Sequence, residues 1–414
     1  MTADSSDFAW KDTNIDWERE WGDVNWPALV DYALVKKQEM LGDQETAIAC
    51  QLANECNAGG RNVLRLLNFS DSTKWVVRLR RSGGEPESTD QELRFHSEVA
   101  TMRLLAEQTS IRVPQVYAYE PNALNSPVGA AFMLMEFLYG MNAIDAFGGL
   151  GRGGQVPREY RASFFPAFAE LHAEIASVRF PKIGSIIQLD DGTYDIGPIP
   201  YLGGPFDTAA DYFAAWCRHT PFNRTESNLR AVCERQEPDL VEPLVASALN
   251  FPKALEELLP SMPLRPGPFP LVHGDFSHHN VLVDAANTTK ITAVVDWEQS
   301  TTVPWELVRL PLFLPDFPDV LVQAGRTARG NPELQSWEVR MDRDSEPKAA
   351  LRAEYVGYVA EAEKAKGLDG VLSVVLGERR CQELAVGMDL WENEGTPAFY
   401  EALLEAWKGG LGEE

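Results

Sequence analysis

Residues 271–284, LVHGDFSHHNVLVD, hold most of the side chains in this sequence whose types and spacing could perform chemistry. The eight positions 273–280 contain three histidines, an aspartate and an asparagine, next to apolar residues typical of a buried strand. A buried polar group without a partner costs roughly 2–7 kcal/mol. These side chains therefore either satisfy one another in a tight turn or serve a reaction.

Three oxygen-bearing side chains are spaced so that a hairpin would bring them together. Asp275 and Asn280 precede the apolar run VLV, and Asp296 ends the next apolar run, ITAVVDW. A hairpin over 279–298 would place all three at one mouth. Carboxylate and amide oxygens are hard ligands that suit Mg²⁺. Asp275 could instead orient an attacking hydroxyl group or accept its proton.

The elements that must position these residues follow from the spacing of apolar residues. Residues 51–81 predict a hairpin of 62–69 with 74–81, separated by the turn SDST. A helix is predicted over 88–108, capped by Ser88 or Thr89. Strands are predicted within 111–120 and 130–140. Residues 141–270 are expected to be mostly helical, with a Gly/Pro-rich loop at 192–208. Residues 330–414 are expected to be largely helical.

The two motifs resemble those of a known enzyme superfamily. HGDFSHHN followed by VVDWE resembles the H-G-D-x-x-x-x-N and D-W/F-E signatures of the aminoglycoside phosphotransferase and choline kinase superfamily, within it the fungal phosphotransferase-family proteins. The resemblance extends over about residues 50–320. It implies an α+β, bilobal protein-kinase-like fold, with a small β-rich N-lobe and a large, mostly helical C-lobe.

The resemblance also implies the boundaries of the parts and the reaction. An N-terminal helical arm would cover 1–50, the N-lobe 51–140 and the C-lobe 141–414, with the catalytic hairpin at 271–298. The implied activity is ATP- and Mg²⁺-dependent transfer of the γ-phosphoryl group to a hydroxyl of a small molecule. The sequence leaves the acceptor open among aminoglycosides, choline-like amino alcohols, sugars, amino acids and secondary metabolites.

Site residues follow from the resemblance position by position. Asp275 matches the catalytic aspartate, and Asn280 and Asp296 match the metal-binding pair. The matched nucleotide-contacting residues are Gly59 and Gly60 in the loop CNAGGRN, Arg78, its helix partner Glu98, and the hinge residues Glu136 and Leu138.

Several alternatives stay open. The superfamily usually has lysine where this chain has Arg78, and the N-terminal arm is rich in tryptophan. These two features favour the main rival, a catalytically silent nucleotide-binding or scaffold protein. Arg80 lies on the same strand face as Arg78, so the register leaves open which arginine occupies the lysine position. Transfer of a nucleotidyl group, or transfer to a protein side chain, is a second rival. The lack of H-R-D and A-P-E motifs favours a small-molecule acceptor. The loop histidines could bind zinc, and the acidic residues near 192–208 could bind a cationic acceptor: Asp190, Asp191 and Asp195.

Composition limits the partners and the compartment. The 414 residues carry a formal net charge of −25, which disfavours binding to nucleic acid and anionic membranes. The five cysteines are scattered without a C-x-x-C pair, as expected for reduced thiols. The acidic N-terminus lacks both an apolar leader and an Arg-rich presequence, so we expect a cytoplasmic protein. Protein partners and oligomeric state are not predicted.

Overall fold

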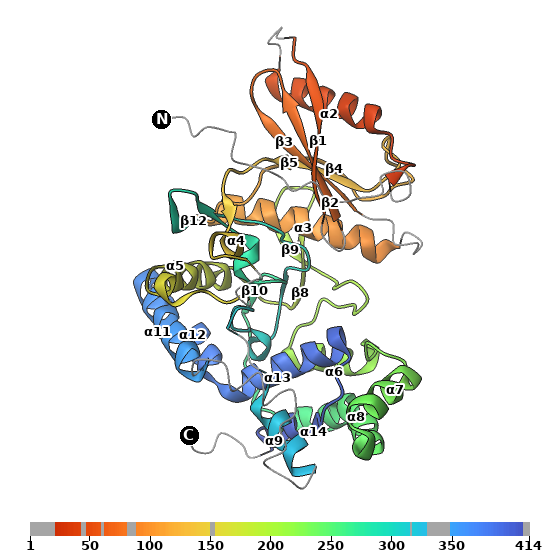
Figure 1. Ribbon diagram of the computed structural model, residues 1–414, viewed down its shortest axis with the longest axis vertical. Helices are drawn as coiled ribbons and strands as arrows, with labels where there is room; N and C mark the ends of the chain where they lie inside the picture. The colour runs from red at the N-terminus through yellow and green to blue at the C-terminus, as the bar shows by residue number, and fades with distance from the viewer. Residues whose placement is uncertain are drawn as a thin grey trace. The chain divides into compact units, whose positions relative to one another are not determined.

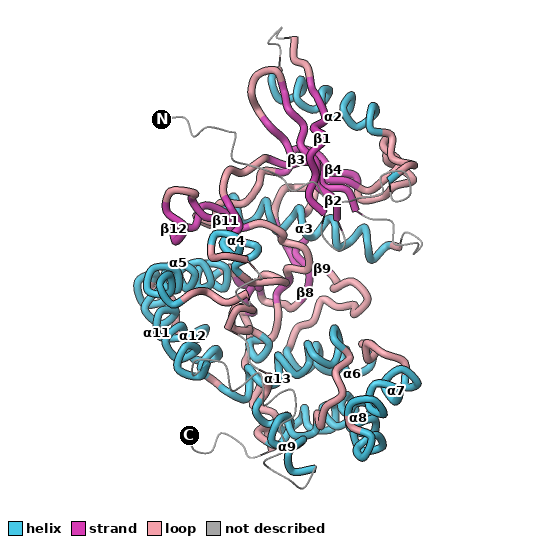
Figure 2. Tube along the Cα trace, in the orientation of Figure 1, coloured by secondary structure: helices cyan, strands magenta, loops and turns pink. Residues whose placement is uncertain are grey.

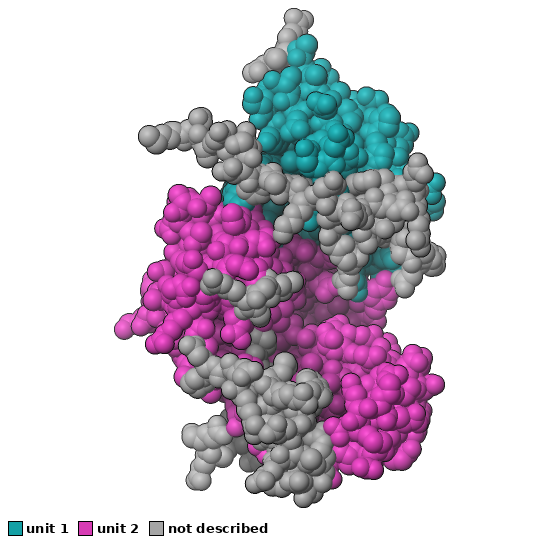
Figure 3. Space-filling view, viewed as in Figure 1, with its two compact units in different colours: residues 1–140, 293–295 teal, residues 141–292, 296–414 magenta. Residues whose placement is uncertain are grey.

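The computed structural model describes residues 21–42, 47–58, 62–80, 88–149, 154–314, 317–328 and 348–408. The chain divides into two compact units, coloured teal and magenta in Figure 3. Unit 1 is residues 1–140 with 293–295, and unit 2 is residues 141–292 with 296–414.

Unit 1 is built on an antiparallel sheet of five strands in the order β1-β2-β3-β5-β4. Figure 2 draws the strands in magenta. The strands are β1 (Cys50–Ala58), β2 (Asn62–Phe69), β3 (Lys74–Arg80), β4 (Val116–Glu120) and β5 (Phe132–Glu136). The predicted hairpin of β2 and β3 is confirmed, with Leu64 opposite Arg78. The strand predicted from residue 111 begins only at Val116, after Pro114, whose missing N–H cannot join a ladder.

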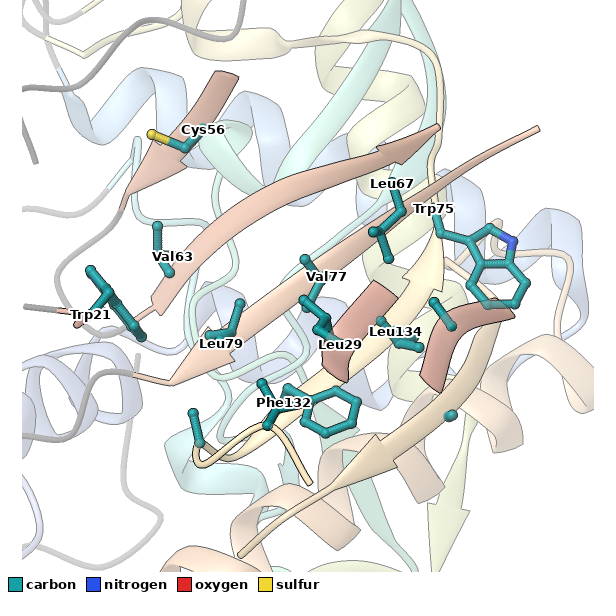
Figure 4. Close-up of a cluster of buried hydrophobic side chains, with 14 of the residues drawn as sticks. Trp21, Leu29, Cys56, Val63, Leu67, Trp75, Val77, Leu79, Phe132 and Leu134 are labelled. Atoms are coloured by element: carbon teal, nitrogen blue, oxygen red, sulfur yellow. The ribbon is translucent and has the colours of Figure 1, made fainter. Parts of the chain in front are cut away.

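Alternation along the strands gives this sheet two different faces. Helix α2 (Trp26–Leu41) is capped at its N-terminus by Asn25, whose side chain accepts a hydrogen bond from the Ala28 N–H at 3.1 Å. Leu29 of α2 lies among Val77 and Phe132 in the apolar core of this unit (Figure 4). Because successive side chains point to opposite faces, Arg78 lies on the face that α2 does not cover.

The predicted helix over 88–108 is confirmed as α3 (Thr89–Gln108). The Ser88 hydroxyl accepts a hydrogen bond from the Gln91 N–H at 3.3 Å, so Ser88 is the N-cap. Asp90 and Glu92 lie in the first turn, where negative charge complements the helix dipole. This helix carries Glu98, which is only 4% exposed.

Unit 2 contains two small sheets, ordered β7-β10-β13-β8-β9 and β12-β11-β6. Their strands are β6 (Met141–Asn142), β7 (Arg179–Phe180), β8 (Gly184–Gln188), β9 (Tyr194–Gly197), β10 (Phe269–Val272), β11 (Val281–Asp284), β12 (Asn287–Val294) and β13 (Thr301–Thr302). The hairpin predicted over 279–298 is confirmed as β11 and β12. Its turn is shorter than expected, because the Asp284 carboxylate accepts hydrogen bonds from the Ala286 and Asn287 N–H groups.

The prediction of a loop over 192–208 is partly wrong, because β9 lies in the first part of this range and pairs with β8. The glycines there serve close packing of strands as well as turns. A Cβ atom on Gly184 would lie 2.2 Å from the carbonyl oxygen of Gly197. Glycine allows such an approach where any side chain would clash.

Helices make up the rest of unit 2, as expected. They are α4 (Ala143–Ala146), α5 (Arg158–Ser177), α6 (Ala209–His219), α7 (Glu226–Gln236), α8 (Val241–Leu258), α9 (Asp319–Ala328), α11 (Lys348–Lys366), α12 (Val371–Gly377), α13 (Arg379–Asp389) and α14 (Glu401–Glu405). Helix α5 continues through Pro166 without a break and packs against α11 and β10 (Figure 1). Within the described ranges, no helix is both long and apolar enough to cross a membrane.

Candidate active site

The loop after β10 is held in shape by a buried histidine. Nδ1 of His273 accepts a hydrogen bond from the backbone N–H of Asp275 at 3.1 Å, which places the ring proton on Nε2. The His273 side chain is 5% exposed, and its ring centroid lies 4.6 Å from that of Trp297. The histidine of the motif therefore fixes the backbone at Asp275.

Aromatic side chains of the same loop anchor it in the core. The Phe276 ring lies 4.4 Å from Phe168 and 4.7 Å from His172, both on α5. The His278 ring lies 5.2 Å from Phe313. The loop thus turns Phe276 and His278 inward, while the Asp275 carboxylate reaches solvent, which explains how so many polar residues lie beside a core strand.

The two carboxylate oxygens of Asp275 have different surroundings. Oδ2 accepts hydrogen bonds from Nε2 of His279 at 2.8 Å and from Nδ2 of Asn280 at 3.1 Å. The same Asn280 nitrogen donates to the Asp275 backbone carbonyl at 2.9 Å. Within the described part of the chain, Oδ1 of Asp275 has no hydrogen-bond partner, and the side chain is 46% exposed.

The electrostatics of this loop keep Asp275 ionised. Partial burial raises the pKa of Asp275, but the hydrogen bond and charge of His279 outweigh it, so the net pKa is lowered. The hydrogen bond to Asp275 raises the pKa of His279, despite its burial, and the nearby charge of Asp296 raises it further. A carboxylate that is ionised at neutral pH can accept a proton.

The segment that follows β12 brings Asp296 to the same loop. Asp296 has a φ of +61°, a left-handed conformation that few non-glycine residues adopt and that is commonest at functional sites. A Cβ atom on Gly274 would lie 2.7 Å from the Glu298 carbonyl oxygen, so the two loops are in direct backbone contact. Unit 2 therefore places the segment that carries Asp296 against the loop that carries Asp275 and Asn280.

The donor set at this loop fits Mg²⁺. Nδ2 of Asn280 is directed at Asp275, which leaves its Oδ1 as a ligand atom, and the Asp296 carboxylate is exposed. Mg²⁺ commonly binds through one or two such protein oxygens, together with waters and substrate phosphates. Among the described residues, no three His, Cys, Asp or Glu side chains are placed to hold a metal ion, so the structure gives no support to the zinc alternative.

In unit 1, Arg78 and Glu98 form a buried ion pair. Nη1 of Arg78 donates to Oε1 of Glu98 at 2.6 Å, and Nη2 donates to Oε2. The side chains are 8% and 4% exposed, and the Arg78 guanidinium lies 5.7 Å from the centre of the Phe95 ring. Of the two arginines on this strand face, Arg78 is thus the one that pairs with the α3 glutamate.

At the remaining positions predicted to contact the nucleotide, the structure offers fewer groups for binding or does not describe the residues. The backbone N–H of Glu136 donates to the Gln115 carbonyl at 2.8 Å, which leaves at most the Glu136 carbonyl for an adenine base. Its carboxylate is bound by Arg112 and by the Gln115 N–H. Leu138 lies in the segment after β5. The last two predicted contacts, Gly59 and Gly60, lie outside the described residues.

An apolar cluster that was not predicted from the sequence lies on the same sheet face as Arg78. Its buried members are Ala53, Leu66, Val76 and Phe137, with Leu64 and Met135 packed against them. The period of two along β3 could have found Val76, two residues before Arg78. Apolar side chains with a charged group beside them are typical of the lining of small-molecule sites.

Comparison with protein families identifies the chain's relatives. A family model described as "Phosphotransferase enzyme family" (APH) matches residues 56–305, which include the Asp275 loop and Asp296. The chain belongs to this phosphotransferase family. The expected superfamily and the mixed α+β, kinase-like fold are therefore confirmed.

Curated relatives match over a shorter range. "Altered inheritance of mitochondria protein 9, mitochondrial" from Komagataella phaffii is 24% identical over 192 residues, 45% of this chain and 30% of the relative. The protein of the same name from Zygosaccharomyces rouxii is 35% identical over 97 residues, 23% of this chain and 16% of the relative. The chain thus matches less than a third of the length of these relatives.

Solved structures also resemble the chain at low sequence identity. A macrolide 2'-phosphotransferase from Brachybacterium faecium gives a TM-score of 0.35 at 16% identity, covering 94% of this chain and 99% of that chain. A protein from Thermobifida fusca, provisionally named a fructosamine-3-kinase, gives 0.42 at 14% identity, covering 88% and 94%. Scores this low assign neither a substrate nor a site.

Proposed function

We propose that this phosphotransferase-family protein is an ATP- and Mg²⁺-dependent kinase of a small molecule, with a hydroxyl group as the acceptor. One observation carries the proposal. The Asp275 carboxylate is ionised, held at one oxygen and open at the other, in the loop that also contains Asn280 and contacts the Asp296 segment. This is the set of side chains that transfer to a hydroxyl requires.

In the proposed reaction, Asp275 acts on the acceptor. Its open oxygen, Oδ1, accepts the proton of the attacking hydroxyl group. A bond forms between the acceptor oxygen and the γ-phosphorus, and the bond from that phosphorus to the β–γ bridging oxygen breaks. The products are a phosphate monoester and ADP. The proton on Asp275 then returns to solvent, which restores the carboxylate.

Metal binding is assigned to the other two side chains of the cluster. Oδ1 of Asn280 and the carboxylate of Asp296 would hold Mg²⁺, for the reasons of donor chemistry given above. When bound, the ion would neutralise charge on the transferred phosphoryl group and on the leaving group.

The nucleotide-binding role belongs to unit 1 in this proposal. Arg78, aligned by Glu98, would contact the α and β phosphates, and the apolar cluster of Ala53, Leu66, Val76 and Phe137 would contact the adenine ring. The Glu136 carbonyl and the backbone at Leu138 would bond the adenine edge. The segment with Gly59 and Gly60 would approach the phosphates.

The acceptor, partners and compartment are proposed in general terms only. We propose a small-molecule hydroxyl acceptor, with no nucleic acid or membrane as partner. The cytoplasmic location expected from the sequence competes with a mitochondrial one, because the curated relatives are named as mitochondrial proteins. Fractionation of cells that express the tagged full chain distinguishes the two locations.

A second candidate function is nucleotide binding without transfer. The observation that favours it is the Arg78–Glu98 pair, in which both terminal nitrogens of Arg78 are bonded to Glu98. A compact lysine point charge at this position would differ in shape and reach from the planar arginine fork. This candidate predicts ATP binding with no acceptor-dependent release of ADP.

The test is an acceptor panel in which ADP release is coupled to an optical readout and products are weighed by mass spectrometry. The panel includes aminoglycosides, amino alcohols, sugars and hydroxyl-bearing amino acids. The proposal predicts at least one product heavier by a phosphoryl group, with activity lost in Asp275→Asn. Asp31→Asn, at an exposed position on α2, is the matched control and should retain activity. ATP binding without any phosphorylated product would favour the second candidate.

A further inference from the structure

The side chain of His279 is not explained by the motif, by the metal site or by packing. It lies one residue before Asn280, in a loop whose other two histidines each have a structural role. His273 holds the Asp275 backbone, and His278 packs against Phe313. The His279 side chain is instead 39% exposed, and the one hydrogen bond that this side chain makes among the described residues is the 2.8 Å contact from Nε2 to Oδ2 of Asp275.

This contact gives the two carboxylate oxygens of Asp275 different roles. Oδ2 is held from two sides, by Nε2 of His279 and by Nδ2 of Asn280. Two donors on one oxygen fix the rotation of the carboxylate about its Cβ–Cγ bond. They leave Oδ1 without a hydrogen-bond partner among the described residues, on a side chain that is 46% exposed, so an acceptor hydroxyl could donate to it.

We propose that His279 is a positioning residue for the transfer reaction: it holds Oδ2 of Asp275 so that Oδ1 is presented to the acceptor hydroxyl. This inference rests on the proposed function, since it assigns Asp275 the role of proton acceptor. The property that His279 must supply is a hydrogen-bond donor at Nε2. Both the neutral Nε2–H form and the imidazolium form supply one, so the role requires no change in charge.

Asn280 alone cannot do this work equally well. Its Nδ2 is shared between Oδ2 and the Asp275 backbone carbonyl, and its Oδ1 is assigned to the metal. An asparagine that moves when the metal binds would loosen the carboxylate, whereas the hydrogen bond from His279 does not involve a proposed metal ligand. Misplacing a catalytic group by about 1 Å can cost 100-fold in rate.

The experiment compares three substitutions in the full-length protein. His279→Leu removes the donor, and His279→Gln retains an N–H near the position of Nε2. His219→Leu, at an exposed position at the end of α6, is the matched control. Each variant is assayed for ADP release from MgATP, with water as the acceptor and with any acceptor from the panel, to obtain kcat and KM for ATP. Thermal unfolding and MgATP calorimetry are measured on the same samples.

The expected result is a fall in kcat of about 10- to 100-fold for His279→Leu, with KM for ATP and MgATP affinity unchanged within about twofold. His279→Gln should recover kcat to within about threefold of wild type, and His219→Leu should match wild type. Equal kcat values for His279→Leu and wild type would overturn the inference while leaving the proposed function intact. A glutamine variant as slow as the leucine variant would also overturn it, because a donor would then not be the required property. No turnover by the wild type with any acceptor would overturn the proposed function and the inference together.

Discussion

Removing either partner of the Arg78–Glu98 pair should strongly destabilise unit 1. Arg78→Met would leave the Glu98 carboxylate, 4% exposed, without the guanidinium that donates a hydrogen bond to each of its two oxygens. A buried charge that loses its ion-pair partner costs about 3–5 kcal/mol. Glu98→Met should cost about as much, for the same reason with the charges exchanged.

The double variant separates the pair's net contribution from the cost of breaking it. With both side chains replaced by methionine, no charge is left buried, so unfolding free energy should return to within about 2 kcal/mol of wild type. Arg78→Lys, which restores the residue usual in the superfamily, keeps the charge but loses one of two parallel bonds. We expect it to cost about 1.5–3 kcal/mol.

Native-state amide hydrogen exchange resolves these effects by region. Peptides from β3 and α3 should lose protection in both single variants and regain most of it in the double variant, while peptides from α5 in unit 2 serve as an internal control. Single variants that cost less than about 1 kcal/mol would refute the argument from burial. A double variant as unstable as the sum of the singles would refute the argument from pairing.

Other parts of the molecule give further predictions. Complete burial lowers the pKa of His172 to about 3, so between pH 6.5 and 3 only the unfolded chain is protonated there, and stability is lost as pH falls; at pH 5 the loss is about 2 kcal/mol. His172→Gln should remove that part of the pH dependence in denaturation curves at pH 7 and pH 5, and a slope equal to wild type would contradict the assignment. Gly274→Ala would place a methyl group 2.7 Å from the Glu298 carbonyl, so it should cost about 1–3 kcal/mol and weaken MgATP binding. Gly357→Ala in α11, with open space around it, should leave the free energy of unfolding unchanged or raise it by up to about 1 kcal/mol. Denaturation curves at pH 7 measure the unfolding free energy of both glycine variants.

The sequence could predict the unit 2 cluster because its logic is local. Asp275, Asn280 and Asp296 lie at the ends of two strands joined by a short turn, and strand alternation with turn chemistry is enough to bring them together. The α3 helix and its Ser88 cap were predictable for the same reason. Each depends on residues that belong to one hairpin or to one helix turn.

Other features required tertiary contacts that no local pattern specifies. Gly197 was included in the predicted loop over 192–208, although it lies in β9, where the close approach to Gly184 of β8 requires glycine. The hydrogen bond from the Glu136 N–H to the Gln115 carbonyl depends on the pairing of β4 with β5. The hydrogen bond from His279 to Asp275 depends on the turn at 278–280, which rotates one histidine inward and the next outward. Spacing alone gave no reason to distinguish His278 from His279.

Calorimetric titration of ATP with and without Mg²⁺ tests the central claim most directly. The wild type, Asp296→Asn and the exposed control Asp31→Asn are titrated under the same conditions. The account predicts Mg²⁺-dependent binding by the wild type and the control, and a loss of at least about tenfold in affinity for Asp296→Asn. ATP binding that is absent in the wild type, or that is equally tight without Mg²⁺ and in Asp296→Asn, would contradict it.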